Sequence, residues 1–155
     1  MTLPPFQALL DAHGHDVHRF LIATVGQAEA DDCFQETWLA ALRAYPQLRD
    51  ASNLRGWLLT IAHRKAIDAF RTRSRGPLPV PELPEEPAAS AAELADDHLW
   101  AQIRGLPAKQ RTAVTLRFLT DAAYDEISRM MGTSPEAARR NVHEGLKRLR
   151  MEYQR

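Results

Sequence analysis

Proline is concentrated in one stretch of this chain, and that stretch limits the possible folds more than any other feature. Residues 76–93, GPLPVPELPEEPAASAAE, contain five of the ten prolines. Proline lacks a backbone donor and disfavours helical geometry in the residue before it, so neither a helix nor a central strand can continue through this stretch. We therefore expect an extended acidic linker, semi-rigid where prolines alternate. It divides the chain into domains at residues 1–75 and 94–155.

The segments on both sides of this linker carry apolar residues at helical spacing. The upstream set is Phe34, Trp38, Leu39 and Leu42, and the downstream set is Ala138, Val142, Leu146 and Leu149. Neither side shows a sustained alternation of period two or a hairpin signal such as Asn-Gly. The predicted fold class is therefore all-α, with two small helical domains joined by the Pro-rich acidic linker.

The 20 basic and 20 acidic side chains cancel in number but are not mixed along the chain. Residues 55–76 and 103–155 each have a net charge of +5, whereas residues 1–54 have −4 and residues 77–102 have −6. Two basic blocks separated by acidic ones are typical of a protein with two anion-binding surfaces, and they favour nucleic acid as a partner. No apolar run approaches the roughly 20 residues that span a bilayer, and the first residues lack the features of a secretion signal. We expect a cytoplasmic protein.

The sequence offers no catalytic or metal-binding motif. Cys33 is the one cysteine, which excludes an internal disulfide and a multi-cysteine zinc site. Its position in an apolar helical pattern predicts a small core residue. The histidines His13, His15 and His18 do not have the i, i+4 spacing of a helical zinc site. Without a glycine-rich phosphate loop or a nucleophile motif, we expect no enzymatic activity, no metal and no cofactor.

The helix expected from residue 57 to residue 75 has two contrasting faces when wound at about 100° per residue. The apolar face gathers Leu58, Leu59, Ala62, Ala66, Ala69 and Phe70, and the opposite face carries Arg64, Arg71 and Arg75. Trp57 stands at the N-terminal end of this helix. Cations beside an aromatic ring suit single-stranded nucleic acid, where each stacked base contributes roughly 1 to 3 kcal/mol. A solvated basic face, with Trp57 against a neighbouring helix, explains the same pattern equally well.

The C-terminal stretch YDEISRMMGTSPEAARRNVHEGLKRLR indicates a helix-turn-helix. A short helix is followed by a turn at Gly132 and by a second helix that Thr133 or Ser134 caps, with Pro135 in its first turn. If Thr133 is the cap, Glu136 completes a capping box. The second helix of such a motif enters the major groove of DNA by its N-terminal part. The residues expected to point toward DNA are Glu136, Arg139, Arg140 and His143.

Three segments in this order resemble an extracytoplasmic-function sigma factor of bacterial RNA polymerase. They are ADDCFQETWLAALRAY, then LRGWLLTIAHRKAIDAFRTRSR, and, after a variable linker, LPAKQRTAVTLRF followed by the helix-turn-helix. The resemblance implies a factor that binds core RNA polymerase and directs promoter-specific transcription initiation. Such a factor recognises the upstream (minus-thirty-five) element as duplex and melts the downstream (minus-ten) element, holding its non-template strand. Members of the family are commonly held inactive by an anti-sigma factor, which we therefore expect as a further partner.

The resemblance also assigns residues to three contact surfaces. Binding to core polymerase falls on Asp32, Gln35, Glu36 and Trp38. Contacts to the downstream element fall on Asn53, Arg55, Trp57, His63, Arg64 and Arg71. Contacts to the upstream element fall on Thr133, Ser134, Glu136, Arg139, Arg140 and His143.

Some residues depart from the family's pattern. Arg64 stands where the family often has asparagine, and Asn141 and Glu144 stand where basic residues are common. Glu144 would repel phosphate if it faced DNA. Gly145 inside a helix costs roughly 0.5 to 1 kcal/mol relative to alanine, so either close packing requires it or the end of the helix is soft.

Two other classes of function remain open from the residues alone. A helix-turn-helix repressor or activator would bind duplex DNA tightly without polymerase, usually as a dimer, but it leaves the acidic motif and the helix from Trp57 unexplained. A protein-interaction module would use both basic faces on acidic partners.

Overall fold

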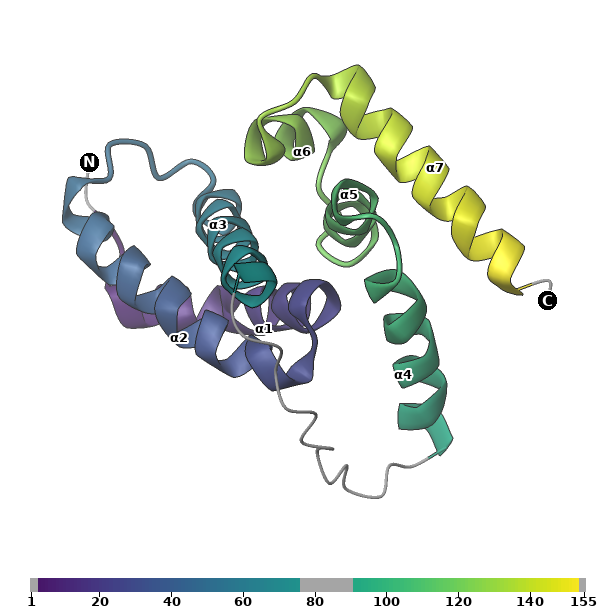
Figure 1. Ribbon diagram of the computed structural model, residues 1–155. Helices are drawn as coiled ribbons and strands as arrows, with labels where there is room; N and C mark the ends of the chain where they lie inside the picture. The colour runs from purple at the N-terminus through teal and green to yellow at the C-terminus, as the bar shows by residue number, and fades with distance from the viewer. Residues whose placement is uncertain (1–2, 76–90, 154–155) are drawn as a thin grey trace.

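The computed structural model describes residues 3–75 and 91–153, and over these residues all regular structure is helical (Figure 1). The elements are α1 (Phe6–Val25), α2 (Gln27–Ala44), a 3₁₀ turn η1 (Tyr45–Gln47), α3 (Leu54–Arg75), α4 (Ala91–Arg104), α5 (Ala108–Phe118), α6 (Tyr124–Met131) and α7 (Pro135–Tyr153). The predicted all-α fold class is confirmed. The expected linker at 76–93 lies mostly outside the described residues, and its last three residues belong to α4. None of the helices in the described part of the chain is long and apolar enough to cross a membrane.

The first three helices pack against one another and form the N-terminal half. Gly26 joins α1 to α2 with a φ of 88°, a backbone geometry that glycine adopts without strain, and so allows the chain to reverse sharply. The centre of this half contains Phe20, Leu21, Leu58 and Leu59, which are fully buried.

In the C-terminal half, α6 and α7 form the predicted helix-turn-helix, and α5 packs against both of them. Gly132 ends α6 in the left-handed conformation, with a φ of 67°. Ser134 Oγ then accepts a hydrogen bond from the backbone N–H of Ala137 at 3.1 Å, so Ser134 is the N-cap of α7, followed by Pro135 in the first turn. Since Thr133 does not cap, the condition for a capping box with Glu136 is not met.

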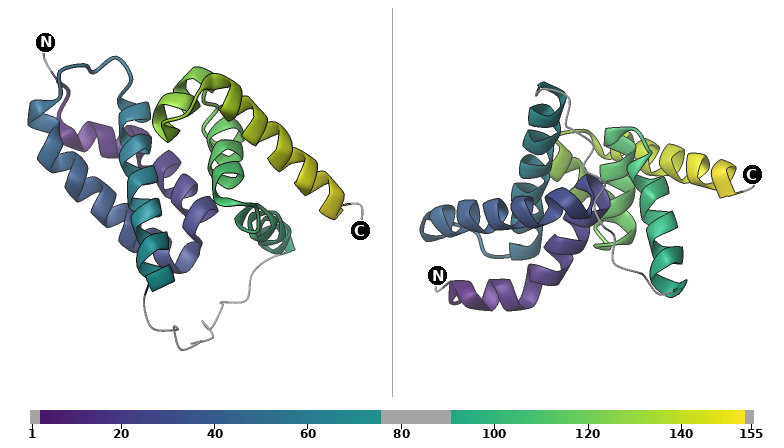
Figure 2. Two further views of the ribbon diagram at one scale, coloured as in Figure 1. Left: turned by 45° about the horizontal axis from the view of Figure 1, so that its top comes forward. Right: turned by 60° about the horizontal axis from the view of Figure 1, so that its bottom comes forward.

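The two halves share one hydrophobic core. Helix α6 lies alongside α3, and α1 contacts both α4 and α5, as the two views of Figure 2 show. Leu116 and Ile127 of the C-terminal half belong to the same buried cluster as Phe20 and Leu58 of the N-terminal half. The two segments predicted from the sequence therefore pack together as one body.

Candidate polymerase and nucleic-acid interfaces

The outer face of α2 combines polar and apolar side chains. Asp32, Gln35 and Glu36, predicted to contact polymerase, are all exposed. Leu39 and Leu42 follow at helical spacing on the same side and are 52% and 51% exposed. The helical spacing of these two leucines is confirmed, and the structure places both on the exposed side of α2. We define the docking face of α2 as these five residues.

Trp38, by contrast, lies in the core. It is only 8% exposed, and its ring makes edge-on contacts with Phe6 and Phe34, at centroid distances of 5.7 and 5.9 Å. Its indole therefore holds α2 against α1 and is not available on the docking face. The sequence prediction that placed Trp38 among the surface contacts misread this side chain, because tryptophan next to an acidic motif carries no signal for which way it points.

Cys33 occupies the buried side of α2, as predicted. Burial raises the pKa of its thiol, and the carboxylates of Glu29, Glu36 and Asp32 raise it further. The thiol is therefore protonated at neutral pH and serves as a small apolar group. Nearby, His18 Nε2 on α1 lies 3.1 Å from Asp31 Oδ1 on α2, linking the two helices at the surface.

The predicted two-faced character of α3 is confirmed for the described side chains. Leu58, Leu59, Ala62 and Ala66 are buried, while Arg64 and Arg71 are exposed. The side chain of Arg75 lies outside the described residues. Trp57 is partly buried, with its ring 6.2 Å from that of Tyr45, so it packs sideways against the preceding turn.

His63 lies beside the basic face of α3 but is itself partly buried. Burial lowers the pKa of its imidazole, and the charge of Arg64 lowers it further. His63 is therefore neutral at physiological pH. A neutral ring can donate or accept a hydrogen bond to a nucleotide, but it does not add a positive charge for phosphate.

The start of α3 carries two further residues predicted to contact DNA. Asn53 Oδ1 accepts a hydrogen bond from the backbone N–H of Gly56 at 3.0 Å, which caps the helix. The side chain of Arg55 lies 3.7 Å from the carboxylate of Asp16 on α1. Both side chains also donate hydrogen bonds to the C-terminal half of the protein. Asn53 donates to the carboxylate of Glu126, and Arg55 donates to the backbone carbonyl of Thr120.

On α7, the residues predicted to face DNA are on the surface. Glu136, Arg139, Arg140 and His143 are exposed. The guanidinium of Arg139 also lies over the ring of Tyr124 on α6, with its Cζ 5.0 Å from the ring centre. This cation–π contact orients Arg139 while leaving it exposed.

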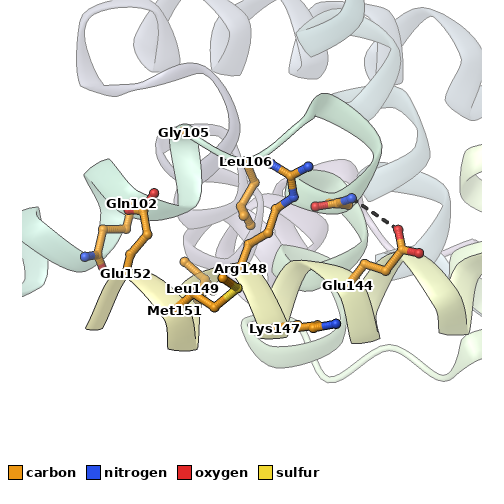
Figure 3. A pocket seen from close by; sticks show the side chains of 10 residues that line it. Gln102, Gly105, Leu106, Glu144, Lys147, Arg148, Leu149, Met151 and Glu152 are labelled. Atoms are coloured by element: carbon orange, nitrogen blue, oxygen red, sulfur yellow. Dashed lines mark hydrogen bonds between the residues drawn. The ribbon is translucent and has the colours of Figure 1, made fainter. Parts of the chain in front are cut away.

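Glu144 on α7 contacts the neighbouring helix α5. Its carboxylate accepts a hydrogen bond from Gln110 Nε2 on α5 at 3.4 Å, drawn as a dashed line in Figure 3. It borders a groove of about 580 Å³ between α4, α5 and the C-terminal part of α7. The groove wall also includes Leu106, Lys147 and Met151 (Figure 3). The carboxylate of Glu144 is thus engaged with Gln110 of α5.

Gly145 lies where α7 packs closely against α5. A Cβ atom on this residue would lie 2.6 Å from Val114 Cγ2 and 3.4 Å from the Cβ of Gln110. Of the two explanations considered from the sequence, close packing is the one that the structure supports.

The three predicted contact surfaces thus lie on different helices. Of the residues assigned to the downstream element, Asn53 and Arg55 at the start of α3 make hydrogen bonds to the C-terminal half. Sequence reasoning missed the exposed pair Leu39 and Leu42. Their spacing from Gln35 and Glu36 is the signal that could have identified them, since positions three or four apart share a face.

Comparisons with known proteins agree with this architecture. Residues 9–76 match the family described as Sigma-70 region 2, and residues 97–149 match Sigma-70 region 4. The ECF RNA polymerase sigma factor SigD of Mycobacterium tuberculosis is 34% identical over 150 residues, covering 88% of this chain and 71% of SigD. The RNA polymerase sigma factor CarQ of Myxococcus xanthus is 29% identical, covering 94% of this chain and 87% of CarQ.

The fold is also found among solved structures. The sigma factor RpoE from Bartonella quintana, crystallised with the anti-sigma factor NepR, superposes with a TM-score of 0.81 at 22% identity, over 96% of each chain. CnrH, solved with the cytosolic domain of CnrY, gives a TM-score of 0.75 at 19% identity over 96% of this chain and 87% of CnrH. Two matched sigma regions in the expected order, together with a relative above 30% identity, show that the chain belongs to the extracytoplasmic-function (ECF) family of RNA polymerase sigma factors.

Proposed function

We propose that this chain binds bacterial core RNA polymerase through the docking face of α2 and directs promoter-specific initiation, reading the minus-thirty-five element with α7 and melting the minus-ten element at α3. The observation that carries the proposal is the exposed, cationic N-terminal part of α7 in a helix-turn-helix, within a chain of the sigma family. Members of this family regulate transcription initiation and are not catalytic enzymes.

Polymerase binding is assigned to α2 because its docking face has the composition of a protein interface. Large apolar side chains that remain half exposed beside polar ones mark sites where a partner buries them. Leu39 and Leu42 supply apolar area, and the carboxylates of Asp32 and Glu36 favour a basic partner surface.

Duplex reading is assigned to α7 because Arg139, Arg140 and His143 are free to enter a major groove. An arginine that donates two hydrogen bonds to a guanine contributes roughly 1 to 3 kcal/mol of discrimination. Thr133 and Ser134 stand at the start of the helix, where phosphate contacts are common. Glu136 would accept from the amino group of a cytosine.

Melting is assigned to α3 because its exposed cations, Arg64 and Arg71, can follow a single strand, while Asn53 and Arg55 offer donors to unstacked bases. His63 lies on the same helix as a neutral hydrogen-bonding group, and the exposed part of Trp57 offers a stacking surface. Extruding a base costs a few kcal/mol, so such specific contacts must replace those lost from the duplex.

An anti-sigma factor is the further partner that we assign to this chain. The Bartonella RpoE structure, which shares its fold over nearly the whole length, is a complex of a sigma factor with the anti-sigma factor NepR, and CnrH, which has the same fold, was solved with the cytosolic domain of CnrY. An inhibitor of this chain would cover the α2 docking face or hold the two halves together.

Run-off transcription from a pool of random promoters tests the proposal. Core RNA polymerase with this protein should yield start sites that share two spaced upstream elements, absent without it. The pair of substitutions Arg139→Ala and Arg140→Ala should abolish these starts, whereas Arg148→Ala, a matched control that lines the groove at the C-terminal part of α7, should retain them. Leu39→Ser with Leu42→Ser should weaken binding to core polymerase at least about tenfold.

No protein-dependent starts, with active core polymerase and folded protein, would contradict the proposal. Tight, polymerase-independent binding of a dimer to duplex DNA would support the repressor alternative instead.

A further inference from the structure

One aromatic ring in the C-terminal half holds two arginines. Tyr124 is the first residue of α6, where α5, α6 and α7 pack together, and its side chain is partly buried (Figure 1). The guanidinium of Arg117, from the last turn of α5, lies over this ring with its Cζ 4.8 Å from the ring centre. The guanidinium of Arg139 on α7 lies over the same ring, at 5.0 Å. Tyr124 therefore connects a residue that we assign to the upstream element with the two helices behind it.

The two arginines are held differently. Nη1 of Arg117 donates a hydrogen bond to the backbone carbonyl of Ala122 at 3.1 Å, and the side chain of Arg117 is partly buried. Arg117 is thus fixed to the turn before α6 and braces the ring of Tyr124. Arg139 is exposed and, among the described residues, makes no hydrogen bond or ion pair. The ring therefore supports the guanidinium of Arg139 and leaves its N–H donors available.

An aromatic ring is a suitable support for an arginine that reads a base. The face of the ring attracts the cation and occupies none of the N–H groups that bond to a guanine. An arginine without such a contact samples many rotamers, and it loses this freedom when it binds DNA. Support in the free protein reduces that loss, so the same hydrogen bonds to a base give tighter and more selective binding.

The neighbouring Arg140 provides an internal comparison. Arg140 follows Arg139 on α7, is also exposed, and lies over no aromatic ring among the described residues. The contact with Tyr124 therefore distinguishes two arginines that are adjacent in sequence and equally available to DNA.

We propose that Tyr124 is a positioning residue for base recognition, which directs the guanidinium of Arg139 toward a base edge of the upstream element while Arg117 braces the ring. The inference rests on the proposed function and deepens it by naming a residue that determines specificity by acting through Arg139. Arg140, which has no such support, contributes mainly through its charge beside the phosphates.

Side-chain mobility in the free, full-length protein tests the support directly. Nuclear magnetic resonance relaxation of the arginine Nε–H groups measures their order on the picosecond-to-nanosecond timescale, and Arg139→Lys and Arg140→Lys assign the two signals. The Nε–H of Arg139 should be more ordered than that of Arg140. Tyr124→Leu removes the ring but keeps an apolar side chain against the core, and it should erase this difference. Tyr124→Phe keeps the ring and should retain the difference.

Binding to altered promoters tests the specificity. The probe is a duplex promoter from the run-off selection, with each position of the upstream element changed in turn, and it is bound by core polymerase that carries this protein. A good bidentate arginine contact discriminates between bases by roughly 5- to 150-fold. Arg139→Ala should lose this factor at one position. Tyr124→Leu should lose most of it at the same position, and Tyr124→Phe should keep it.

Two further variants sharpen the test. Tyr124→Leu should have little additional effect once Arg139 is replaced by alanine, because both changes remove the same contact. Phe118→Leu is the matched control, since it removes a ring that is 61% exposed and holds no arginine among the described residues. Phe118→Leu should change neither the base discrimination nor the mobility of Arg139. Circular dichroism checks the folding of Tyr124→Leu, and if this variant does not fold, Arg117→Met supplies the same two measurements.

Greater mobility of Arg139 in Tyr124→Leu, together with lost discrimination at the position read by Arg139, would support the inference. Equal order of Arg139 and Arg140 in the parent would overturn it. A uniform weakening at all promoter positions would also overturn it, because Tyr124 would then have only a structural role, and so would a full effect of Tyr124→Leu in the Arg139→Ala background. Failure of the proposed function has a different signature: the parent itself gives no protein-dependent starts, whereas the mobility measurement needs neither DNA nor polymerase and still decides whether the ring holds Arg139.

Discussion

The crossing of α7 over α5 at Gly145 gives a prediction whose magnitude follows from the structure. A methyl group at this position would approach Val114 Cγ2 to 2.6 Å, closer than two carbon atoms can pack. Val114 is 3% exposed and β-branched, so its methyl group cannot rotate away freely. Overpacking of this kind costs about 1 to 3 kcal/mol.

Alanine would also recover the helix propensity that glycine loses, about 0.5 to 1 kcal/mol. The net effect of Gly145→Ala is therefore a loss of about 1 kcal/mol, or a fall in Tm of about 2 to 4 °C for a chain of this length. Thermal unfolding followed by circular dichroism measures it directly.

Gly14 on α1 provides the matched control. A Cβ there would meet Leu10 Cδ1 at 3.7 Å and Phe34 Cζ at 3.9 Å, which are ordinary contact distances. Gly14→Ala should therefore raise Tm, because only the propensity term remains. Combining Gly145→Ala with Val114→Ala should cost less than the sum of the two single changes. A Gly145→Ala protein as stable as the parent would refute the reasoning from close packing.

Three further predictions concern single side chains. The pKa of His63 is lowered in the folded protein, so the unfolded chain binds a proton more readily than the folded one, and the free energy of unfolding falls as pH drops below about 6.5. Urea unfolding at pH 7.5 and 5.5 should therefore show a smaller loss of unfolding free energy on acidification for His63→Gln than for the parent. An equal loss in both proteins would contradict this. The thiol of Cys33 is buried and its pKa is raised, so Ellman's reagent should label it slowly in the folded protein and fast in urea. Equally fast labelling under both conditions would count against a buried thiol. Ser134→Ala should cost about 1 kcal/mol through loss of the N-cap of α7, whereas Thr133→Ala should cost less in the same unfolding assay.

Local features of this fold could be predicted from the sequence because they depend on neighbouring residues. The turn at Gly132 and the cap that follows obey backbone rules that act over four residues. The period of Leu58, Ala62 and Ala66 identified the buried side of α3. Family resemblance then supplied the order of the regions and the residues of the three contact surfaces.

Features that depend on distant partners could not be predicted in this way. Trp38 and Leu42 are four residues apart in α2 and both fit the helical apolar pattern, yet Trp38 is buried and Leu42 is exposed. The pattern cannot separate them because apolar residues occupy two neighbouring sides of the helix. The contact of Arg111 with Thr24 joins positions 87 residues apart and has no local signature. A charge count placed Glu144 in a basic block but did not reveal that it turns toward α5.

The core shared by the two halves has a consequence for how the free protein unfolds. Halves of this size bury only a modest core when alone, and here Leu116 and Ile127 are packed in one cluster with Phe20 and Leu58. The free chain should therefore lose its structure in one cooperative transition, with amide hydrogens of α1 and α5 exchanging at similar rates. Any change that separates the halves would replace this single cooperative unit with two weaker ones, which a protease would cut more readily.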